Sequence, residues 1–347
     1  MKRFAGRKWT LAGLIFGCLA AAAPAAPPDT LSAPDLVNHP DRWPAAVTLQ
    51  RDYKFTNGAV AHQGDKVRVL QFDGTHVTLL TSSNIRFSVT PEECGLLDAA
   101  NQAWSALTPA QRAVDSGSIS ADLSLWPPRV ALTTPINCSF GALPAGTEVG
   151  LVSVSTKGPV IQWPNSPNRL TVNFGMTDLL ARAQQAVLLD PDKRPSRIAA
   201  ALQPLLVDSD GKPCHDDHLE GKKFFAFYFG ANWCQPCHDF SPGFVKFLNG
   251  VMPQHPELAV VLMSNDPQPA QMLAYMKEEK MPFPAVPQKD LLQSSLLMSY
   301  AAKMIPHLVI VDRFGKVLAT SDDSNGNRFD PMDTAAALGK MLAASRS

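Results

Sequence analysis

A run of apolar residues leads directly into two cysteines that are separated by two residues. Residues 224–229, of sequence FFAFYF, predict a buried strand, and the aromatic residues within 238–248 have the spacing of a helix. Cys234 and Cys237 lie between these two segments. A helix that begins near Cys234 offers it free backbone N–H groups and the positive end of the helix dipole, which favour a thiolate. The sequence therefore predicts a redox-active cysteine pair at a strand–helix junction.

The chain around this pair alternates strands and helices from about residue 195 to its end. We expect a strand and turn at 205–212, core strands at 258–264 and 307–311, and a hairpin strand at 316–320. Helices are expected at 269–280, 291–303 and 332–343. The uninterrupted apolar character of 258–264 is typical of a sheet that is covered on both faces. This order predicts a βαβ unit followed by a β-hairpin and a helix.

Four separated segments carry a resemblance to a known family. They are residues 228–237 (YFGANWCQPC), 240–242 (FSP), 283–287 (FPAVP) and 305–306 (IP). In this order they resemble thioredoxin-fold proteins of the tryparedoxin and nucleoredoxin branch. The resemblance implies an α/β thioredoxin fold whose chemistry depends on a redox-active disulfide, with no other cofactor.

The resemblance also implies roles for residues around the pair. Cys234 is the expected nucleophile, which forms a mixed disulfide with the substrate, and Cys237 is the expected resolving cysteine. Tyr228 stands where other thioredoxins carry a buried aspartate. The residues expected to support the site are Trp233, Pro236, Tyr228, Ile305 and Pro306.

Three of these supporting positions have specific expected tasks. Pro236 lacks an N–H and restricts the first helical turn. Trp233 shields one side of the disulfide and offers a face to the substrate. The resemblance implies a cis peptide bond between Ile305 and Pro306 that faces the pair, with the Ile305 backbone pairing with the substrate like an added strand.

Two histidines depart from the family pattern and are candidate modulators. His238 follows the second cysteine, where the family often has arginine, and His307 follows the proline, where threonine is common. A His307 cation directed at the pair would favour the Cys234 thiolate and make the disulfide more oxidising. The alternative for His307 is a partly exposed side chain at the start of a strand.

The cysteine pair could instead form a structural disulfide or half of a zinc site. The chain has no second CxxC at ligand spacing, and the strand–helix context favours redox chemistry. Residues 214–218 (CHDDH) gather further potential metal ligands, but adjacent side chains alternate in direction, so only some could converge on one ion. We therefore predict no metal site and favour a free thiol or an intermolecular disulfide at Cys214.

The N-terminus has the features of a secretory signal peptide. Basic residues precede an apolar run at 11–23 that is too short to span a membrane comfortably, and small residues near Ala25 suit cleavage there. The sequence thus predicts a signal peptide over 1–25 and an exported, periplasmic protein. The alternatives are a buried N-terminal helix and lipidation of Cys18, which would anchor the protein to a membrane.

Segments 43–105 and 126–187 resemble each other at a nearly constant offset. Trp43-Pro44 recurs as Trp126-Pro127, for example. Each segment alternates apolar and polar residues in short runs separated by glycine-containing turns, which predicts several short strands. The pattern resembles tandem bacterial SH3-like domains, which are small β-barrels that usually bind peptides, cell-wall fragments or partner proteins. Spacers or dimerisation modules are the alternative.

The predicted architecture is a multidomain chain in which two small SH3-like β-barrels precede an α/β thioredoxin fold. Its parts are a signal peptide (1–25), a linker (26–42), two SH3-like domains (43–110 and 126–190) and a thioredoxin-like domain (195–347).

Two further cysteines fall in different repeats. An exported protein meets an oxidising compartment, where cysteines pair. A structural disulfide between Cys94 and Cys138 would clamp the repeats together. Two buried, inert cysteines are the alternative.

These features predict an exported thiol–disulfide oxidoreductase, acting as a reductase on protein or peptide disulfides and fed by an unidentified electron donor. The 31 basic and 31 acidic residues balance, so no nucleic acid partner is indicated. The alternative is an envelope adaptor whose SH3-like domains bind a cell-wall or protein ligand, with the thioredoxin-like domain for redox sensing or docking. A peroxidase is disfavoured because peroxidatic cysteines usually lie in a different loop.

Overall fold

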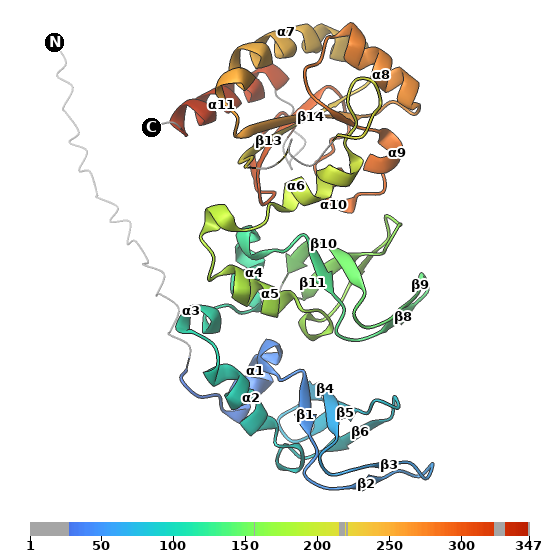
Figure 1. Cartoon of the computed structure of the whole chain (residues 1–347), viewed down its shortest axis with the longest axis vertical. Helices are drawn as coiled ribbons and strands as arrows, with labels where there is room; N and C mark the ends of the chain where they lie inside the picture. Colours follow the sequence, from blue (N-terminus) through green and yellow to red (C-terminus); the bar gives the residue numbers. More distant parts are fainter. Residues whose placement is uncertain (1–27, 156, 215–218, 220, 323–329, 346–347) are drawn as a thin grey trace, which may run out of the picture.

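The computed structural model describes residues 28–155, 157–214, 219, 221–322 and 330–345. Figure 1 shows three bodies in chain order, which we call the first unit (residues 32–106), the second unit (115–189) and the C-terminal domain (from 195). The predicted signal peptide at 1–25 lies outside the described residues. Within the described part of the chain, no helix has the length and apolar character needed to cross a membrane.

The C-terminal domain is built on a five-stranded sheet of order β15-β14-β13-β16-β17. Its strands are β13 (Phe224–Gly230), β14 (Leu258–Ser264), β15 (Ala285–Val286), β16 (His307–Asp312) and β17 (Val317–Thr320). β14 runs parallel to β13 on one side, and β16 runs antiparallel to it on the other. β13 is buried along almost its whole length, because its apolar side chains alternate between two covered faces.

Helices cover both faces of this sheet (Figure 1). One face carries α7 (Gln235–Val251), α8 (Pro269–Glu278) and α11 (Pro331–Ala344). The other carries α6 (Arg197–Leu202), α9 (Gln288–Leu291) and α10 (Ser295–Met298). The predicted βαβ unit, hairpin and final helix are thus confirmed.

Two local predictions in this domain were wrong. Of the helix expected at 291–303 only α10 is present, because α9 already ends at Leu291 and the Ser294 hydroxyl, which accepts from the Leu297 N–H, caps a separate short helix. Of the strand and turn expected at 205–212, the turn is present, but the strand is reduced to isolated bridges of Val207 with Ala285 and Pro213.

The two N-terminal units share one strand order. The first sheet runs β1 (Ala46–Thr48), β4 (Lys66–Phe72), β5 (Val77–Leu80) and β6 (Arg86–Val89). The second sheet runs β7 (Arg129–Ala131), β10 (Glu148–Ser155), β11 (Gly158–Gln162) and β12 (Arg169–Thr171). A helix follows each sheet, α2 (Leu96–Ser105) in the first unit and α5 (Leu179–Ala186) in the second. The shared order supports the internal repeat that the sequence offset predicts.

The expected SH3-like barrels are not confirmed, because both four-stranded sheets are open. Within the described residues, the edge strands β1 and β6 do not pair with each other, and neither do β7 and β12. The remaining strands form separate two-stranded sheets, β2 (Tyr53–Lys54) with β3 (Val60–Ala61) and β8 (Ile136–Cys138) with β9 (Gly141–Leu143).

The structural repeat also begins earlier than the sequence comparison indicated. Helices α1 (Ala33–Asn38) and α4 (Ser116–Ala121) each start with a capping box, at Ser32 and Asp115 respectively. The Trp43 and Trp126 indoles donate to carbonyls of these helices, at 2.6 and 2.5 Å. Residues 32–42, expected within the linker 26–42, therefore form part of the first unit, where Leu36 is buried in the core.

A buried arginine joins the second unit to the C-terminal domain. Arg197, at the start of α6, donates through Nη2 to the Leu151 carbonyl at 2.8 Å and to the Val152 carbonyl. Val152 is the extra residue of a β-bulge between β10 and β11. The Arg197 guanidinium also lies 4.9 Å from the centre of the Trp126 ring. Burial lowers the pKa of Arg197 to about 10, so the side chain stays cationic at neutral pH.

Replacing Arg197 by methionine should lower the free energy of unfolding by about 2 kcal/mol, because two buried carbonyls lose their donor. Urea unfolding of the whole chain measures this loss. Arg169→Met, on an exposed position of β12, is the matched control and should change stability little. Equal unfolding free energies in the two variants would contradict a joining role for Arg197.

Candidate active site

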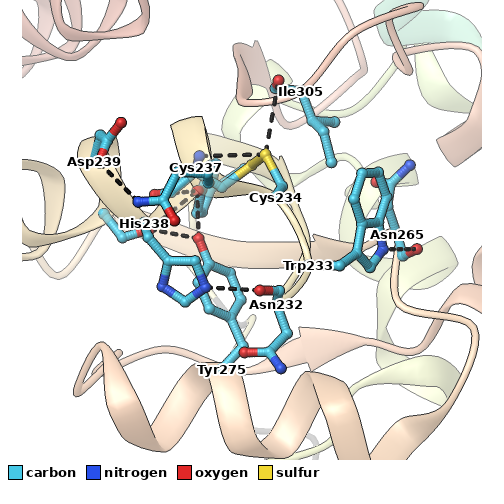
Figure 2. Close-up of a disulfide and its surroundings, with 12 residues drawn as sticks. Asn232, Trp233, Cys234, Cys237, His238, Asp239, Asn265, Tyr275 and Ile305 are labelled. Atoms are coloured by element: carbon cyan, nitrogen blue, oxygen red, sulfur yellow. Dashed lines mark hydrogen bonds between the residues drawn. A yellow bond between two sulfur atoms is a disulfide. The ribbon is translucent and has the colours of Figure 1, made fainter.

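The cysteine pair lies where β13 ends and α7 begins (Figure 2). Cys234 is the N-cap residue of α7, and its Sγ accepts from the Cys237 N–H at 3.2 Å. Pro236 falls in the first turn, where its missing N–H removes no helical hydrogen bond. Cys234 and Cys237 are joined by a disulfide, with their Cα atoms 5.2 Å apart. The junction thus places both sulfurs at the positive end of a helix.

The two cysteines of the pair differ in solvent exposure. Exposed apolar side chains lie next to the pair and next to the cis peptide in the sequence. Cys237 is fully buried, whereas Cys234 is 4 % exposed. Trp233 is 62 % exposed, and its Nε1 lies 3.4 Å from the Asn265 carbonyl that accepts from it (Figure 2). Met304, next to the cis peptide, is 61 % exposed. An approaching molecule would therefore meet Cys234 before Cys237.

The peptide bond between Ile305 and Pro306 is cis, as the resemblance implies. The Ile305 carbonyl oxygen lies 3.9 Å from Cys234 Sγ, and Figure 2 shows it directed at the disulfide. The expected segments at 228–237 and 305–306 therefore meet at the disulfide, although 71 residues separate Cys234 from Ile305.

Three buried hydroxyl groups form a closed triangle under the first turn of α7. The Tyr228 hydroxyl lies 2.8 Å from that of Tyr275 and 3.0 Å from that of Ser241, and the last two are 2.7 Å apart. Tyr228 also donates to the Cys237 carbonyl at 3.4 Å. Burial raises the pKa of Tyr228 above its ordinary value and that of Tyr275 to about 12, so both phenols stay neutral donors.

Sequence reasoning found Tyr228 but not its two partners. Ser241 follows Cys237 by four residues, so it lies on the helix face that also carries Phe244 and Leu248. A polar residue on that otherwise apolar face was the available signal. Tyr275 gave no comparable signal, because an aromatic residue on the buried side of a helix is ordinarily core.

His238 contacts the segment that leads into the pair. Its Nε2 lies 2.7 Å from the Asn232 carbonyl oxygen, and its Nδ1 lies 2.7 Å from Glu279 Oε1, just past α8. The ring packs edge-on against Tyr275, with centroids 5.0 Å apart. Hydrogen bonding to the Asn232 carbonyl, with a further contribution from Glu279, raises the pKa of His238. Neither Asn232 nor Glu279 was predicted as part of the site.

His307 differs from both expectations for it. It is 3 % exposed and pairs with Phe229 across β13 and β16, against whose ring it packs on the face opposite α7. Its Nδ1 lies 3.0 Å from Ser321 Oγ, and its Nε2 lies 3.2 Å from the Tyr300 carbonyl. The side chain is therefore neither directed at the sulfurs nor partly exposed.

The other described cysteines carry no disulfide. Cys94 is buried in the core of the first unit, where burial raises the pKa of its thiol to about 11, and Cys138 lies on β8 of the second unit. The expected bridge between them is absent from the structure. Cys214 is partly buried, while residues 215–218 of the suggested metal cluster lie outside the described residues.

Residues 221–317 match the model of a protein family described as thioredoxin-like. This stretch contains β13, α7, β14, the cysteine pair and the cis peptide, so the chain contains a thioredoxin-like domain. The thioredoxin fold expected for the C-terminal region is confirmed.

Proteins similar to this domain include nucleoredoxins and tryparedoxins. The chain is 33 % identical over 124 residues to probable nucleoredoxin 1 of Arabidopsis thaliana, covering 35 % of this chain and 21 % of that protein. It is 29 % identical over 114 residues to mouse (Mus musculus) nucleoredoxin, covering 33 % of this chain and 26 % of the relative. The chain thus spans about a fifth of the length of the Arabidopsis protein and about a quarter of the length of the mouse protein. The solved structure of tryparedoxin I from Crithidia fasciculata is 29 % identical in sequence, with a TM-score of 0.30. The match covers 35 % of this chain and 85 % of the tryparedoxin chain.

Tyr228→Phe should lower the free energy of unfolding by about 1 kcal/mol, because one buried hydrogen-bonding group is lost while Ser241 and Tyr275 remain paired. It should also shift the reduction potential of the cysteine pair, because the donor to the Cys237 carbonyl is removed. Urea unfolding and equilibration with glutathione measure the two effects.

Tyr300→Phe is the matched control, since it removes a hydroxyl that donates to the Gly315 carbonyl on the other face of the sheet. It should lower stability without shifting the potential. An equal shift in both variants would show that the hydroxyl triangle has no specific effect on the pair.

Proposed function

We propose that the chain is a thiol–disulfide oxidoreductase that reduces disulfides of protein or peptide substrates. The observation that carries this proposal is Cys234 at the N-cap of α7, with Sγ held before the Cys237 N–H in a thioredoxin-like domain. That N–H and the helix dipole stabilise a thiolate at Cys234, which is the attacking species in disulfide exchange.

The reaction proceeds by two exchanges that start from the reduced pair. The Cys234 thiolate attacks one sulfur of the substrate disulfide, forms a mixed disulfide and releases the other substrate sulfur as a thiolate, which takes a proton from solvent. Cys237, deprotonated for the second step, attacks Cys234 Sγ and releases the remaining substrate thiolate. The Cys234–Cys237 disulfide forms, and two electrons pass to the substrate. An external dithiol donor then reduces this disulfide again, so no cofactor beyond the cysteine pair is required.

The surface around Cys234 favours an extended peptide as substrate. Trp233 and Met304 present exposed apolar surface on the two segments that meet at the disulfide. The Ile305 carbonyl, 3.9 Å from Cys234 Sγ, offers a backbone acceptor beside the sulfur to be attacked. Buried Cys237 is placed to resolve the mixed disulfide rather than to start the exchange.

The compartment proposed for this reaction is the periplasm. The support is the basic and apolar pattern of residues 1–25 and the suitability of an oxidising compartment for disulfide substrates. The reductase direction then requires electrons delivered from outside that compartment.

Turnover should depend on both cysteines of the pair in different ways. Cys234→Ser should abolish dithiothreitol-coupled reduction of insulin, whereas Cys237→Ser should accumulate a mixed disulfide with the substrate that mass spectrometry detects. Cys214→Ser, at a free thiol of the same domain, is the matched control and should keep full activity. Insulin reduction by the Cys234→Ser variant at the normal rate would refute the proposed function.

The reduction potential of the pair decides the direction of the reaction. A value near −270 mV, about that of thioredoxin, supports a reductase, and a value near −120 mV, about that of a strong oxidant, contradicts it.

A groove in the second unit favours a second candidate function, that of an adaptor that binds a cell-wall or protein ligand. It has a volume of about 420 Å³ and is lined by the segment Trp126-Pro127-Pro128 and by Leu189, which is 45 % exposed. An apolar concave surface of this size suits a peptide side chain.

Leu189→Asp should abolish co-sedimentation with insoluble peptidoglycan if the groove binds cell-wall fragments, because a charge would enter an apolar surface. Leu188→Asp is the matched control, since Leu188 is similarly exposed but does not line the groove. The same sedimentation of wild type and the Leu189→Asp variant would exclude this ligand for the groove.

A further inference from the structure

The backbone just before the cysteine pair is held from two sides. The Asn232 N–H donates to Asp266 Oδ1 at 2.9 Å, and the Asn232 carbonyl lies 2.7 Å from His238 Nε2 (Figure 2). Asp266 is 2 % exposed, and its other oxygen accepts from the Ser264 hydroxyl at 3.2 Å. Both hydrogen-bonding groups of the Asn232 backbone are therefore fixed two residues before Cys234.

The partners of His238 require a proton on each ring nitrogen. A backbone carbonyl and a carboxylate accept hydrogen bonds and have no proton to give. Nε2 must donate to the Asn232 carbonyl, and Nδ1 must donate to Glu279 Oε1, at 2.7 Å in each case. Hydrogen bonding to Asn232 and Glu279 raises the pKa of His238, in agreement with this doubly protonated imidazolium.

The charged groups around His238 also favour its cationic form. The negative charges of Glu278, at the end of α8, of Glu279, just after it, and of Asp266, after β14, all attract its positive charge, and the Tyr275 ring packs against it. His238 itself lies in the first turn of α7, where the helix dipole disfavours a positive charge. The contacts with Asn232 and Glu279 offset this cost and explain why a cation can occupy the position.

We propose that His238 is a positioning residue of the redox pair, which ties the Asn232 backbone to α7 and to Glu279 and so holds Cys234 Sγ before the Cys237 N–H. This inference rests on the proposed function, since it assigns His238 a part in the same exchange. His238 touches neither sulfur in the contacts described, so it acts through the Asn232 backbone and its own charge.

The positioning contact should depend on pH in a defined direction. Because the pKa of His238 is raised in the folded protein, its stabilising contribution is complete below the unfolded value of about 6.5. It is lost as the pH rises through the higher folded-state pKa. Above that pH, Glu279 faces an unprotonated ring nitrogen, and one of the two contacts is lost.

The test compares His238→Phe, His238→Arg and His255→Phe in the whole reduced protein. Phenylalanine keeps the packing against Tyr275 and removes both donors, whereas arginine keeps the charge and several donors. His255 is the matched control, because its Nδ1 also lies 2.8 Å from a glutamate oxygen, that of Glu257. It precedes the start of β14, whereas the active-site loop follows the far end of the parallel strand β13. Iodoacetamide alkylation of Cys234, followed by mass spectrometry from pH 5 to 10, gives its thiolate reactivity.

His238→Phe should slow Cys234 alkylation at pH 7 and insulin reduction roughly tenfold, because both hydrogen bonds of the imidazolium are lost. His238→Arg should restore most of both rates, and His255→Phe should leave both unchanged. Equal rates in His238→Phe and wild type, or an equal decrease in His255→Phe, would overturn the positioning role.

The alkylation measurement also separates this inference from the proposed function. A wild-type protein that reduces no disulfide would refute the oxidoreductase proposal. The alkylation rates of the three variants would still decide whether His238 positions Cys234.

Discussion

The hydrogen bond from the Cys237 N–H to Cys234 Sγ is the interaction on which the candidate site depends. It exists because β13 ends at Gly230 and α7 begins at Gln235, so that Cys234 takes the N-cap position. A side chain at that position meets backbone N–H groups that have no helical partner. The same contact that begins the helix therefore also favours the thiolate that attacks a disulfide.

Two polar arrangements support this junction from different sides. Beneath it, the hydroxyls of Tyr228, Ser241 and Tyr275 satisfy one another within an otherwise apolar core. Beside it, His238 and Asp266 fix the backbone of the preceding loop. Buried polar groups of this kind are stable only when each finds a partner, and complete pairing makes the local structure rigid.

The N-terminal half shows which features of a fold local sequence patterns can predict. The constant offset between repeats anticipated two units with the same strand order, because strand alternation and glycine turns are local properties. Whether a sheet closes depends on pairing between its edges, which lie far apart in the sequence, so the expected barrels could not be derived and are open sheets. The expected Cys94–Cys138 bridge failed for a related reason, since Cys94 is enclosed in the core of its own unit.

The sequence by itself determined the strand–CxxC–helix order, the βαβ-hairpin arrangement and the approach of Ile305-Pro306 to the pair, because apolar periodicity and family motifs carry that information. Only the tertiary structure decided the partners of the site: Tyr275, Glu279 and Asp266 come from segments with no recognisable motif. Only the tertiary structure shows that His307 lies on the sheet face opposite α7 and that Arg197 is buried against the second unit. The reason is physical, since the direction of a side chain and the group that satisfies it depend on packing between distant segments.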